Sequence, residues 1–376
     1  MSKTTAQGPT TESIEQMGMM QVLADARLSV EAKAMVAQGF YTGVSQEVST
    51  VIPLKDGADP DLGLLRHLVI AGWGEELGHY LEILDVREIS APEALRKAQL
   101  AVRSGTALFA AGSLATSTGL HCLLSIHHGL ADEHSLAVLA RLLQAAQSAE
   151  VDSVLAHMCR GRGVYDDYVQ AQALYADVDG GLLTSVAQPM APVRLLQTGC
   201  LAFNAQGQRM SMQRTLDVAS INVDKPPMAN ILSCLQRADV IAEGDTLCSS
   251  HNWREADQQD AIGMMTGLVP LSLANPGAHP LPGQISLEAH ARRCPAARQA
   301  LECCRASELF INGAGQRGIP ASQVMSATFP VGIDIRRTGA SQLLLEIEGP
   351  FCNPSAATNL LNELADVLMD RSEWND

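Results

Sequence analysis

The sequence predicts an α/β (α+β) protein built from two lobes. Apolar segments of strand type and of helix type are interspersed along the whole chain, which is typical of a mixed fold. A length of 376 residues exceeds what one hydrophobic core usually organises, so we expect two domains. Gly180-Gly181, at the start of a stretch poor in charge, is the expected crossing point. The predicted division is a polar tail over residues 1–15, a first lobe over 16–179 and a second lobe over 180–376.

Four segments are expected to form strands. Residues 48–52 are rich in β-branched side chains, and residues 120–126 are almost continuously apolar, as in a strand covered on both faces. Residues 262–273 contain two glycines and a proline, which predicts an irregular or edge strand. Residues 343–348 follow a turn-like Thr-Gly-Ala sequence and alternate at their end.

Helical periodicity is clear in three places. Apolar residues at helical spacing mark residues 62–70, 136–143 and 360–368. The last segment is entered through Pro354 and Ser355, and these residue types fit a first helical turn with the serine as its N-cap.

The composition is that of a globular protein with an acidic surface. Hydrophobic residues make up 47% of the chain, and 41 acidic residues against 26 basic ones give a formal net charge of −15. This charge repels nucleic acid, and no basic cluster in the sequence counters it. The nine cysteines include no C-x-x-C pair, which favours reduced thiols. The chain begins without a signal-peptide pattern and lacks a run of about 18 apolar residues, so we expect a cytoplasmic protein without a membrane span.

The most informative local feature is a pair of histidines that follows the apolar segment 120–126. His127 and His128 are followed, after three residues, by Asp132, and a helical pattern begins directly afterwards. Histidine is a good base near neutral pH because its ordinary pKa is about 6.5. Neighbouring strand residues point to opposite faces, so only one histidine of the pair faces a given cleft. Asp132 either orients a histidine or pairs with a distant arginine.

The histidines of this region also have two other interpretations, a structural role and a metal site. A His-His pair taken alone is more often structural or exposed than catalytic. A metal site would have to use His121, His127, His128 and His134 with Asp132. Their spacing matches no zinc pattern and adjacent strand residues diverge, so we expect no metal.

Residues 127–135 resemble the H-H-x-x-x-D-G motif of the condensation-domain and chloramphenicol-acetyltransferase-like superfamily. This group includes condensation domains of nonribosomal peptide synthesis and polyketide-associated acyltransferases. Looser similarities extend over most of the chain. Residues 165–168 resemble the Y-x-D-[FY] element, residues 261–271 resemble I-G-x-F-V-N-T-x-P-L, and residues 342–351 resemble the final strand. Arg254 stands where the family has a Gly-Arg pair.

The chain departs from the family pattern at three points. Glu133 stands where the motif has glycine, and a side chain there excludes some conformations with positive φ. Gly267 replaces the family asparagine, so a polar contact in the channel is missing. Residues 71–77 hold only a reduced form of the R-H-E-x-L-R stretch. These departures bear on the substrate more than on the fold.

The resemblance implies two similar lobes in a V-shaped pseudo-dimer with a central channel, and a histidine motif midway along that channel. His128 is then the expected catalytic base, and His127 is a packing or hydrogen-bonding residue. Gly129 either lets the backbone approach an oxyanion or serves a tight turn. Asp132 has a structural role through an ion pair with an arginine, for which Arg254 is the expected partner.

Arg336 is the second candidate for that ion pair. Four further residues are candidates for the lining of the channel: Tyr165, Trp253, Met264 and Gly267. Core packing is the alternative role for the aromatic side chains and for the methionine.

The function implied by the resemblance is that of a free-standing acyltransferase. The donor is the thioester of an acyl-CoA or of a phosphopantetheinyl carrier protein, and the acceptor is a small-molecule alcohol or amine. We expect no bound cofactor and a role in polyketide or nonribosomal peptide biosynthesis. Two alternatives stay open: a stand-alone peptide condensation enzyme between two carrier-bound substrates, and a non-catalytic binding member of the same fold.

Overall fold

A computed structural model gives the arrangement of the chain. It describes the following residues: 18–19, 21–23, 26–42, 46–54, 60–147, 150–175, 190–196, 199–217, 228–273, 286–312, 329–339 and 342–369. The expected tail over residues 1–15 and the expected crossing at Gly180-Gly181 lie outside these ranges.

The chain divides into two compact units. The first contains Met1–Val169 and Ala256–Met264, and the second contains Gln170–Glu255, Met265–Pro320 and Val324–Asp376. The chain therefore returns to the first unit at Ala256–Met264 after leaving it. This return segment, Ala256–Met264, contributes to the candidate site.

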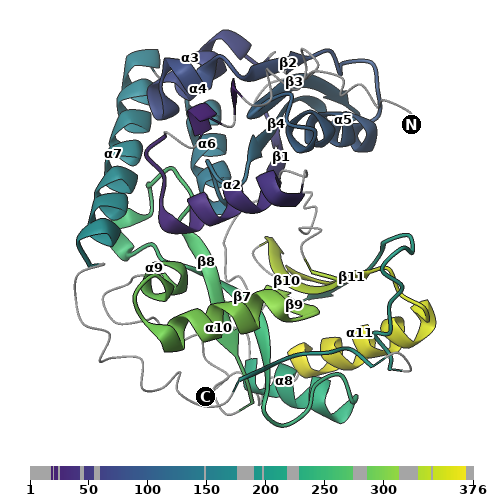
Figure 1. Cartoon of the computed structure of the whole chain (residues 1–376). Helices are drawn as coiled ribbons and strands as arrows, with labels where there is room; N and C mark the ends of the chain where they lie inside the picture. Colours follow the sequence, from purple (N-terminus) through teal and green to yellow (C-terminus); the bar gives the residue numbers. More distant parts are fainter. Residues whose placement is uncertain are drawn as a thin grey trace, which may run out of the picture. The chain divides into compact units, whose positions relative to one another are not determined.

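The first unit is a four-stranded sheet with helices on both faces. Its strands follow the order β1-β4-β3-β2, and only the pair of β2 and β3 is parallel. In Figure 1, α5 lies on one side of this sheet, and α3, α6 and α7 lie on the other. Its elements are α2 (Val30–Thr42), β1 (Glu47–Pro53), α3 (Leu62–Trp73), α4 (Glu75–Gly78), β2 (Leu81–Leu84), α5 (Ala91–Arg103), β3 (Phe109–Thr116), β4 (Gly119–His127), α6 (Glu133–Ala145) and α7 (Val151–Tyr175).

The expected elements of this unit are confirmed. The segments predicted as strands, 48–52 and 120–126, lie in β1 and β4, and those predicted as helices, 62–70 and 136–143, lie in α3 and α6. The second half of β4 is buried throughout, because α5 packs small side chains against one face of the sheet while other helices cover the opposite face. Such double coverage explains the continuous apolar run that precedes the histidines.

The second unit is built on a seven-stranded sheet. Its strands follow the order β5-β7-β9-β10-β11-β6, and β8 pairs with β7 beside this path. Its elements are β5 (Ala191–Pro192), β6 (Met210–Asp217), α8 (Met228–Arg237), β7 (Asp245–Asn252), β8 (Thr266–Leu271), α9 (Leu287–Ala291), α10 (Pro295–Ala306), β9 (Leu309–Asn312), β10 (Val331–Gly339), β11 (Gln342–Gly349) and α11 (Pro354–Met369), while the short 3-10 helix η3 (Ala256–Gln258) belongs to the return segment.

Two expectations for the second half of the chain need correction. The strand predicted over residues 262–273 is wrong in its first part, because only Thr266–Leu271 forms β8. The backbone N–H groups of Ile262 and Gly263 donate to Gly161 and Ser135 in the first unit instead of to a strand. The strand predicted over 343–348 is confirmed in β11.

The predicted helix over residues 360–368 is confirmed in α11, but its expected serine cap is wrong. Pro354 already belongs to the helix, so Ser355 lies inside its first turn. The cap is supplied by Asn353, whose side-chain oxygen accepts a hydrogen bond of 3.2 Å from the backbone N–H of Ala356.

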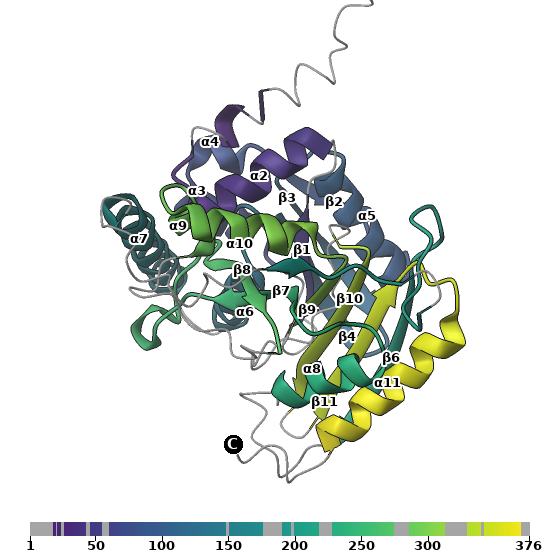
Figure 2. The same ribbon diagram turned by 60° about the horizontal axis from the view of Figure 1, so that its bottom comes forward.

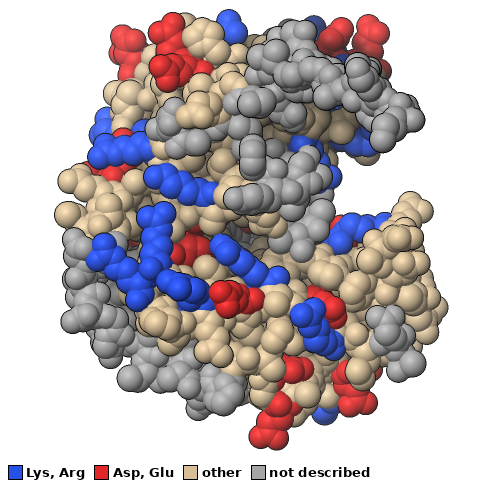
Figure 3. Space-filling view, viewed as in Figure 1, with Lys and Arg blue, Asp and Glu red and all other residues tan. Residues whose placement is uncertain are grey.

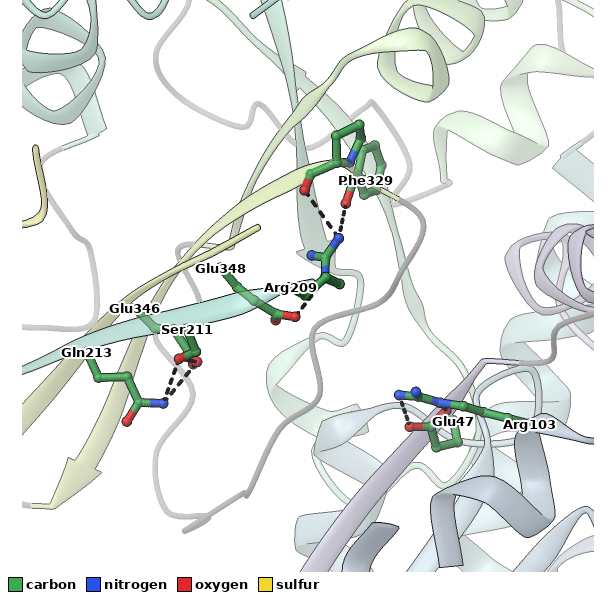
Figure 4. A network of polar contacts seen from close by, with 9 residues as sticks. Glu47, Arg103, Arg209, Ser211, Gln213, Phe329, Glu346 and Glu348 are labelled. Atoms are coloured by element: carbon green, nitrogen blue, oxygen red, sulfur yellow. Dashed lines mark hydrogen bonds and ion pairs between the residues drawn. The ribbon is translucent and has the colours of Figure 1, made fainter. Parts of the chain in front are cut away.

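The two faces of the large sheet differ in character. Figure 2 shows α8 and α11 running along the same side of the sheet, where they cover a large apolar core. The other face carries polar side chains of β6 and β11 (Figure 4): Ser211 and Gln213 bond Glu346, and Arg209 pairs with Glu348 at 2.8 Å. Charged groups on this face are therefore compensated within the sheet.

Two classes of feature are absent from the described ranges. No helix there combines the length and the apolar character needed to cross a membrane. Within the same ranges, no three histidine, cysteine or acidic side chains gather as a metal ion would require. All nine cysteines are described, and all are free thiols.

Candidate active site

The two histidines of the motif stand at the end of β4, in a turn that is anchored on both sides. The backbone N–H of His127 donates to the carbonyl of Leu108, and that of His128 donates to the carbonyl of Gln46, both at 2.8 Å. The N–H of Leu130 then donates to the carbonyl of His127 at 2.8 Å and closes the turn. These bonds fix the positions of both imidazoles relative to the sheet.

His128 has one ring nitrogen fixed and one available. Its Nδ1 lies 3.0 Å from the carbonyl oxygen of Ala131. A carbonyl oxygen only accepts hydrogen bonds, so Nδ1 carries the proton and Nε2 carries the lone pair. The side chain is half-buried, and Nε2 has no hydrogen-bond partner among the residues that the structure describes. This is the arrangement that a histidine base requires.

The ring of His127, unlike that of His128, is enclosed by the protein. The ring is fully buried, and its Nδ1 accepts a hydrogen bond of 3.0 Å from the backbone N–H of Gly129. Burial, together with the charge of His128, lowers the pKa of His127 to about 4. His127 is therefore neutral at pH 7 and stays inside the first unit, where a substrate does not reach it.

Gly129 is required by close packing. A β-carbon at this position would lie 2.7 Å from Cγ2 of Val36 and 3.2 Å from Nδ1 of His127. Its N–H group is already donated to His127, so it is not available to a developing oxyanion. Of the two expected roles of Gly129, the structure supports the one in a tight turn.

Asp132 caps the helix that follows the motif. Its buried carboxylate accepts a hydrogen bond of 2.9 Å from the backbone N–H of Ser135 and one of 2.8 Å from the Ser135 hydroxyl. An aspartate at this position stabilises the first turn of α6 and the chain entering it. The turn that holds His128 is therefore continuous with a capped helix.

Glu133, the departure from the family glycine, causes no backbone strain. It is the first residue of α6 and is half-exposed. Among the described residues, the one non-glycine residue with a positive φ is Asp239. The carboxylate of Glu133 also lies at the positive end of the helix, where negative charge is favourable.

Ser135 links the motif to the return segment Ala256–Met264, and the sequence analysis did not identify it. Its buried hydroxyl lies 2.8 Å from the carbonyl of Gly263 and accepts from the Gly263 N–H at 3.0 Å. One hydroxyl proton serves either Asp132 or Gly263 at a time. The signal available in the sequence was the Asp-x-x-Ser spacing before an apolar helix.

Further contacts hold the return segment against the first unit. The hydroxyl of Ser29 donates to the carbonyl of Met264 at 2.9 Å, and Arg141 pairs with Asp260 at 3.2 Å. His134, from the first turn of α6, places Nε2 2.6 Å from the carbonyl of Gln259. Met264, an expected channel residue, is itself buried here.

Tyr165, another expected channel residue, is a core residue in the structure. Its ring is fully buried, and a β-carbon on Gly263 would lie 2.2 Å from it. Its hydroxyl accepts a hydrogen bond of 2.9 Å from the N–H of Ser29, and the guanidinium of Arg162 stacks 4.5 Å from the ring centre. Burial raises the pKa of Tyr165 to about 12, so the hydroxyl stays protonated.

A partly buried ion pair between Glu47 on β1 and Arg103 on α5 lies beside the histidines. Glu47 lies opposite His127 in the strand pairing, and its carboxylate accepts two hydrogen bonds, of 2.7 and 2.8 Å, from Arg103 (Figure 4). Burial raises the pKa of Glu47, while Arg103 and His128 act in the opposite direction. Arg103 thus stabilises a carboxylate within electrostatic reach of His128. Sequence patterns alone do not reveal this pair.

The remaining expected residues belong to the second unit. Trp253 is buried and meets His251 edge to face at 4.7 Å, and the N–H and Nη1 groups of Arg254 donate to Asn252 at 3.1 Å. Gly267 is buried in β8 opposite His251. The ion pair of Asp132 with Arg254 stays a prediction.

Arg336, the second candidate partner, lies in β10 and pairs with Asp334 at 2.6 Å and with Glu346. Both carboxylates are nearly or fully buried within the second unit.

Comparison with known proteins identifies the fold. The sequence matches no protein-family model and no curated protein. Among solved structures, a mutant starter condensation domain of rhizomide synthetase RzmA has a TM-score of 0.55 at 14% identity, and covers 92% of this chain and 97% of that one. The same domain in complex with C8-CoA has a TM-score of 0.53 at 13% identity, with 92% and 95% covered.

The epimerization domain of the third module of tyrocidine synthetase B is similar to the same degree. Its TM-score is 0.53 at 16% identity, and 89% of this chain and 94% of that one are covered. At these identities the likeness concerns the fold alone. The chain therefore has the fold of these condensation and epimerization domains, as the resemblance of the histidine motif predicted. The V-shaped arrangement and the channel stay predictions.

Replacement of Ser135 by alanine tests the link between the motif and the return segment. We expect Ser135→Ala to lower the free energy of unfolding by about 1–3 kcal/mol, because Gly263 loses a buried hydrogen-bond partner. Chemical denaturation measures this loss, and amide exchange at Gly263 should become faster. Ser153→Ala, at an exposed serine of α7, is the matched control. A loss below about 0.5 kcal/mol, the range of ordinary surface substitutions, contradicts the assignment.

The buried neutral state of His127 predicts a pH dependence of stability. The unfolded chain binds a proton at His127 near pH 6.5, whereas the folded chain does so only near pH 4. Stability therefore falls as the pH drops through this window, by about 2–3 kcal/mol, and is fully present above it. Denaturation of the native chain and of His127→Gln at pH 7 and pH 4.5 measures the effect. Equal losses of stability in both proteins would show that His127 does not cause it.

Proposed function

We propose that this protein is an acyltransferase that moves an acyl group from a thioester to an alcohol or amine, with His128 as the general base. The observation that carries this proposal is the hydrogen bond from Nδ1 of His128 to the carbonyl of Ala131. It leaves the lone pair of Nε2 available on a half-buried ring in a rigid turn. The condensation-domain fold supports a reaction of this class.

The reaction requires one proton transfer in each direction. Nε2 of His128 takes the proton from the acceptor hydroxyl or amine as its oxygen or nitrogen attacks the thioester carbonyl. The carbon–sulfur bond then breaks, and the departing thiolate takes the proton back from His128. The attack passes through no acyl-enzyme, so no serine or cysteine nucleophile is needed. Positioning of the two reactants lowers the barrier further.

The neighbouring charges favour this cycle. The imidazolium that forms at His128 is positive, and the paired carboxylate of Glu47 lies within its electrostatic reach. The buried and neutral His127 adds no competing positive charge at pH 7.

For the donor we propose an acyl-CoA or an acyl group on a phosphopantetheinyl carrier protein, since both present the same thioester. Octanoyl-CoA is the first probe, because a starter condensation domain with this fold was crystallised with C8-CoA. For the acceptor we propose an alcohol or an amine, because each carries a proton that a histidine base can remove as it attacks. The fold's occurrence in peptide synthetases is consistent with a role in nonribosomal peptide or polyketide biosynthesis.

The proposal is tested by following octanoyl-CoA with a mixture of primary alcohols and amines, and then the same acyl group on a carrier protein, by mass spectrometry. We expect His128→Ala to slow acyl transfer by about 10²–10⁴-fold, as loss of a general base does. His121→Ala is the matched control, because His121 lies on the same strand and bonds Gly119. Transfer at an unchanged rate in a folded His128→Ala protein would contradict the proposal.

A further inference from the structure

A hollow in the second unit has the chemistry of a ligand site. It lies between α8 and α11 and has a volume of about 570 Å³. None of its residues belongs to the unit that carries the histidine motif. Its wall is formed by two helix faces that consist of Asn230, Ser233, Cys234, Arg237, Glu363, Asp366 and Val367.

The spacing of these residues shows that each helix contributes one continuous stripe. The four from α8 are separated by three, one and three positions, and the three from α11 by three and one, so each set lies on one helix face. The opposite face of α8 packs Ile231, Leu232 and Leu235 into the apolar core. The hollow therefore has a lining that is partly polar and partly apolar, and it lies above the apolar core between two helices.

The two walls carry opposite charges that do not meet. Arg237 projects from α8 and Glu363 from α11, but neither forms an ion pair with any described residue. All three charged residues are exposed at the rim of the hollow, and the third, Asp366, lies 3.9 Å from Arg214. Arg237 and Glu363 thus face the same hollow without pairing with each other.

The thiol of Cys234, at the floor of the hollow, is influenced by both charged residues. The thiol of Cys234 is buried, and the guanidinium of Arg237 lies within hydrogen-bonding reach of it. The charge of Glu363 acts on the same thiol. Both charged groups therefore stand at the exposed rim of the hollow, within electrostatic reach of the sulfur at its floor.

We propose that this hollow binds a small zwitterion, of which a free α-amino acid is the simplest. The carboxylate of the ligand would pair with Arg237, and its ammonium group with Glu363. Asn230 contributes an amide that donates and accepts, and the Ser233 hydroxyl, which donates to Ala229 at 2.8 Å, keeps lone pairs for a ligand donor. The volume lies within the usual range of small-molecule sites.

Ligand-observed NMR titrations with each of the twenty proteinogenic α-amino acids test the proposal. We expect at least one to bind saturably, with a dissociation constant below about 10 mM. Arg237→Gln and Glu363→Gln should each weaken that binding about tenfold or more, since each removes a charged hydrogen bond. Arg292→Gln, at an exposed arginine outside the hollow, should leave binding unchanged.

Two analogues of whichever amino acid binds test the two charged contacts separately. Its carboxamide lacks the carboxylate that Arg237 would hold, and its N-acetyl form lacks the ammonium group. We expect both to bind at least about tenfold more weakly than the parent. Absence of saturable binding by all twenty amino acids overturns the proposal. Equal affinity of the native protein and Arg237→Gln, or of the parent and its N-acetyl form, also overturns it.

Discussion

The hydrogen bond between Nδ1 of His128 and the carbonyl of Ala131 is the interaction on which the account of the site depends. It selects one tautomer and one ring orientation, and so decides which nitrogen is basic. Its geometry depends on the turn between β4 and α6. That turn is fixed at one end by the bond from His128 to Gln46, the residue before β1, and at the other by the Asp132 cap. The catalytic nitrogen is therefore oriented by ordinary elements of secondary structure.

The two histidines of the motif have different roles because their surroundings differ. His127 lies inside the unit, where burial keeps it neutral and the N–H of Gly129 occupies its Nδ1. His128 follows in the turn, one residue beyond the end of β4, and is half-buried. The end of the strand thus separates a packing histidine from one with an available ring nitrogen. Replacement of either residue is expected to have different consequences: loss of pH-dependent stability for one and loss of proton transfer for the other.

The sequence predicted those parts of the molecule that depend on local pattern. The apolar run 120–126 and the periodic segment 136–143 identified the strand and the helix around the motif, because burial imposes period and composition directly. The link from Ser135 to Gly263 and the pair of Glu47 with Arg103 were not predicted, since they join residues 128 and 56 positions apart. Residues 262–264 belong to the segment predicted as a strand, but their backbone bonds to Gly161, Ser135 and Ser29 of the first unit. Local pattern does not encode such partners.

The tautomer of His128 tests the central claim most directly. Imidazole ¹⁵N chemical shifts, recorded above the titration range of the ring, distinguish a protonated from an unprotonated ring nitrogen. The account predicts that Nδ1 of His128 is protonated and that Nε2 is not. The reverse tautomer, or a mixture of both, would contradict it, because the ring would then not be held by Ala131 and no nitrogen would be reserved for the substrate.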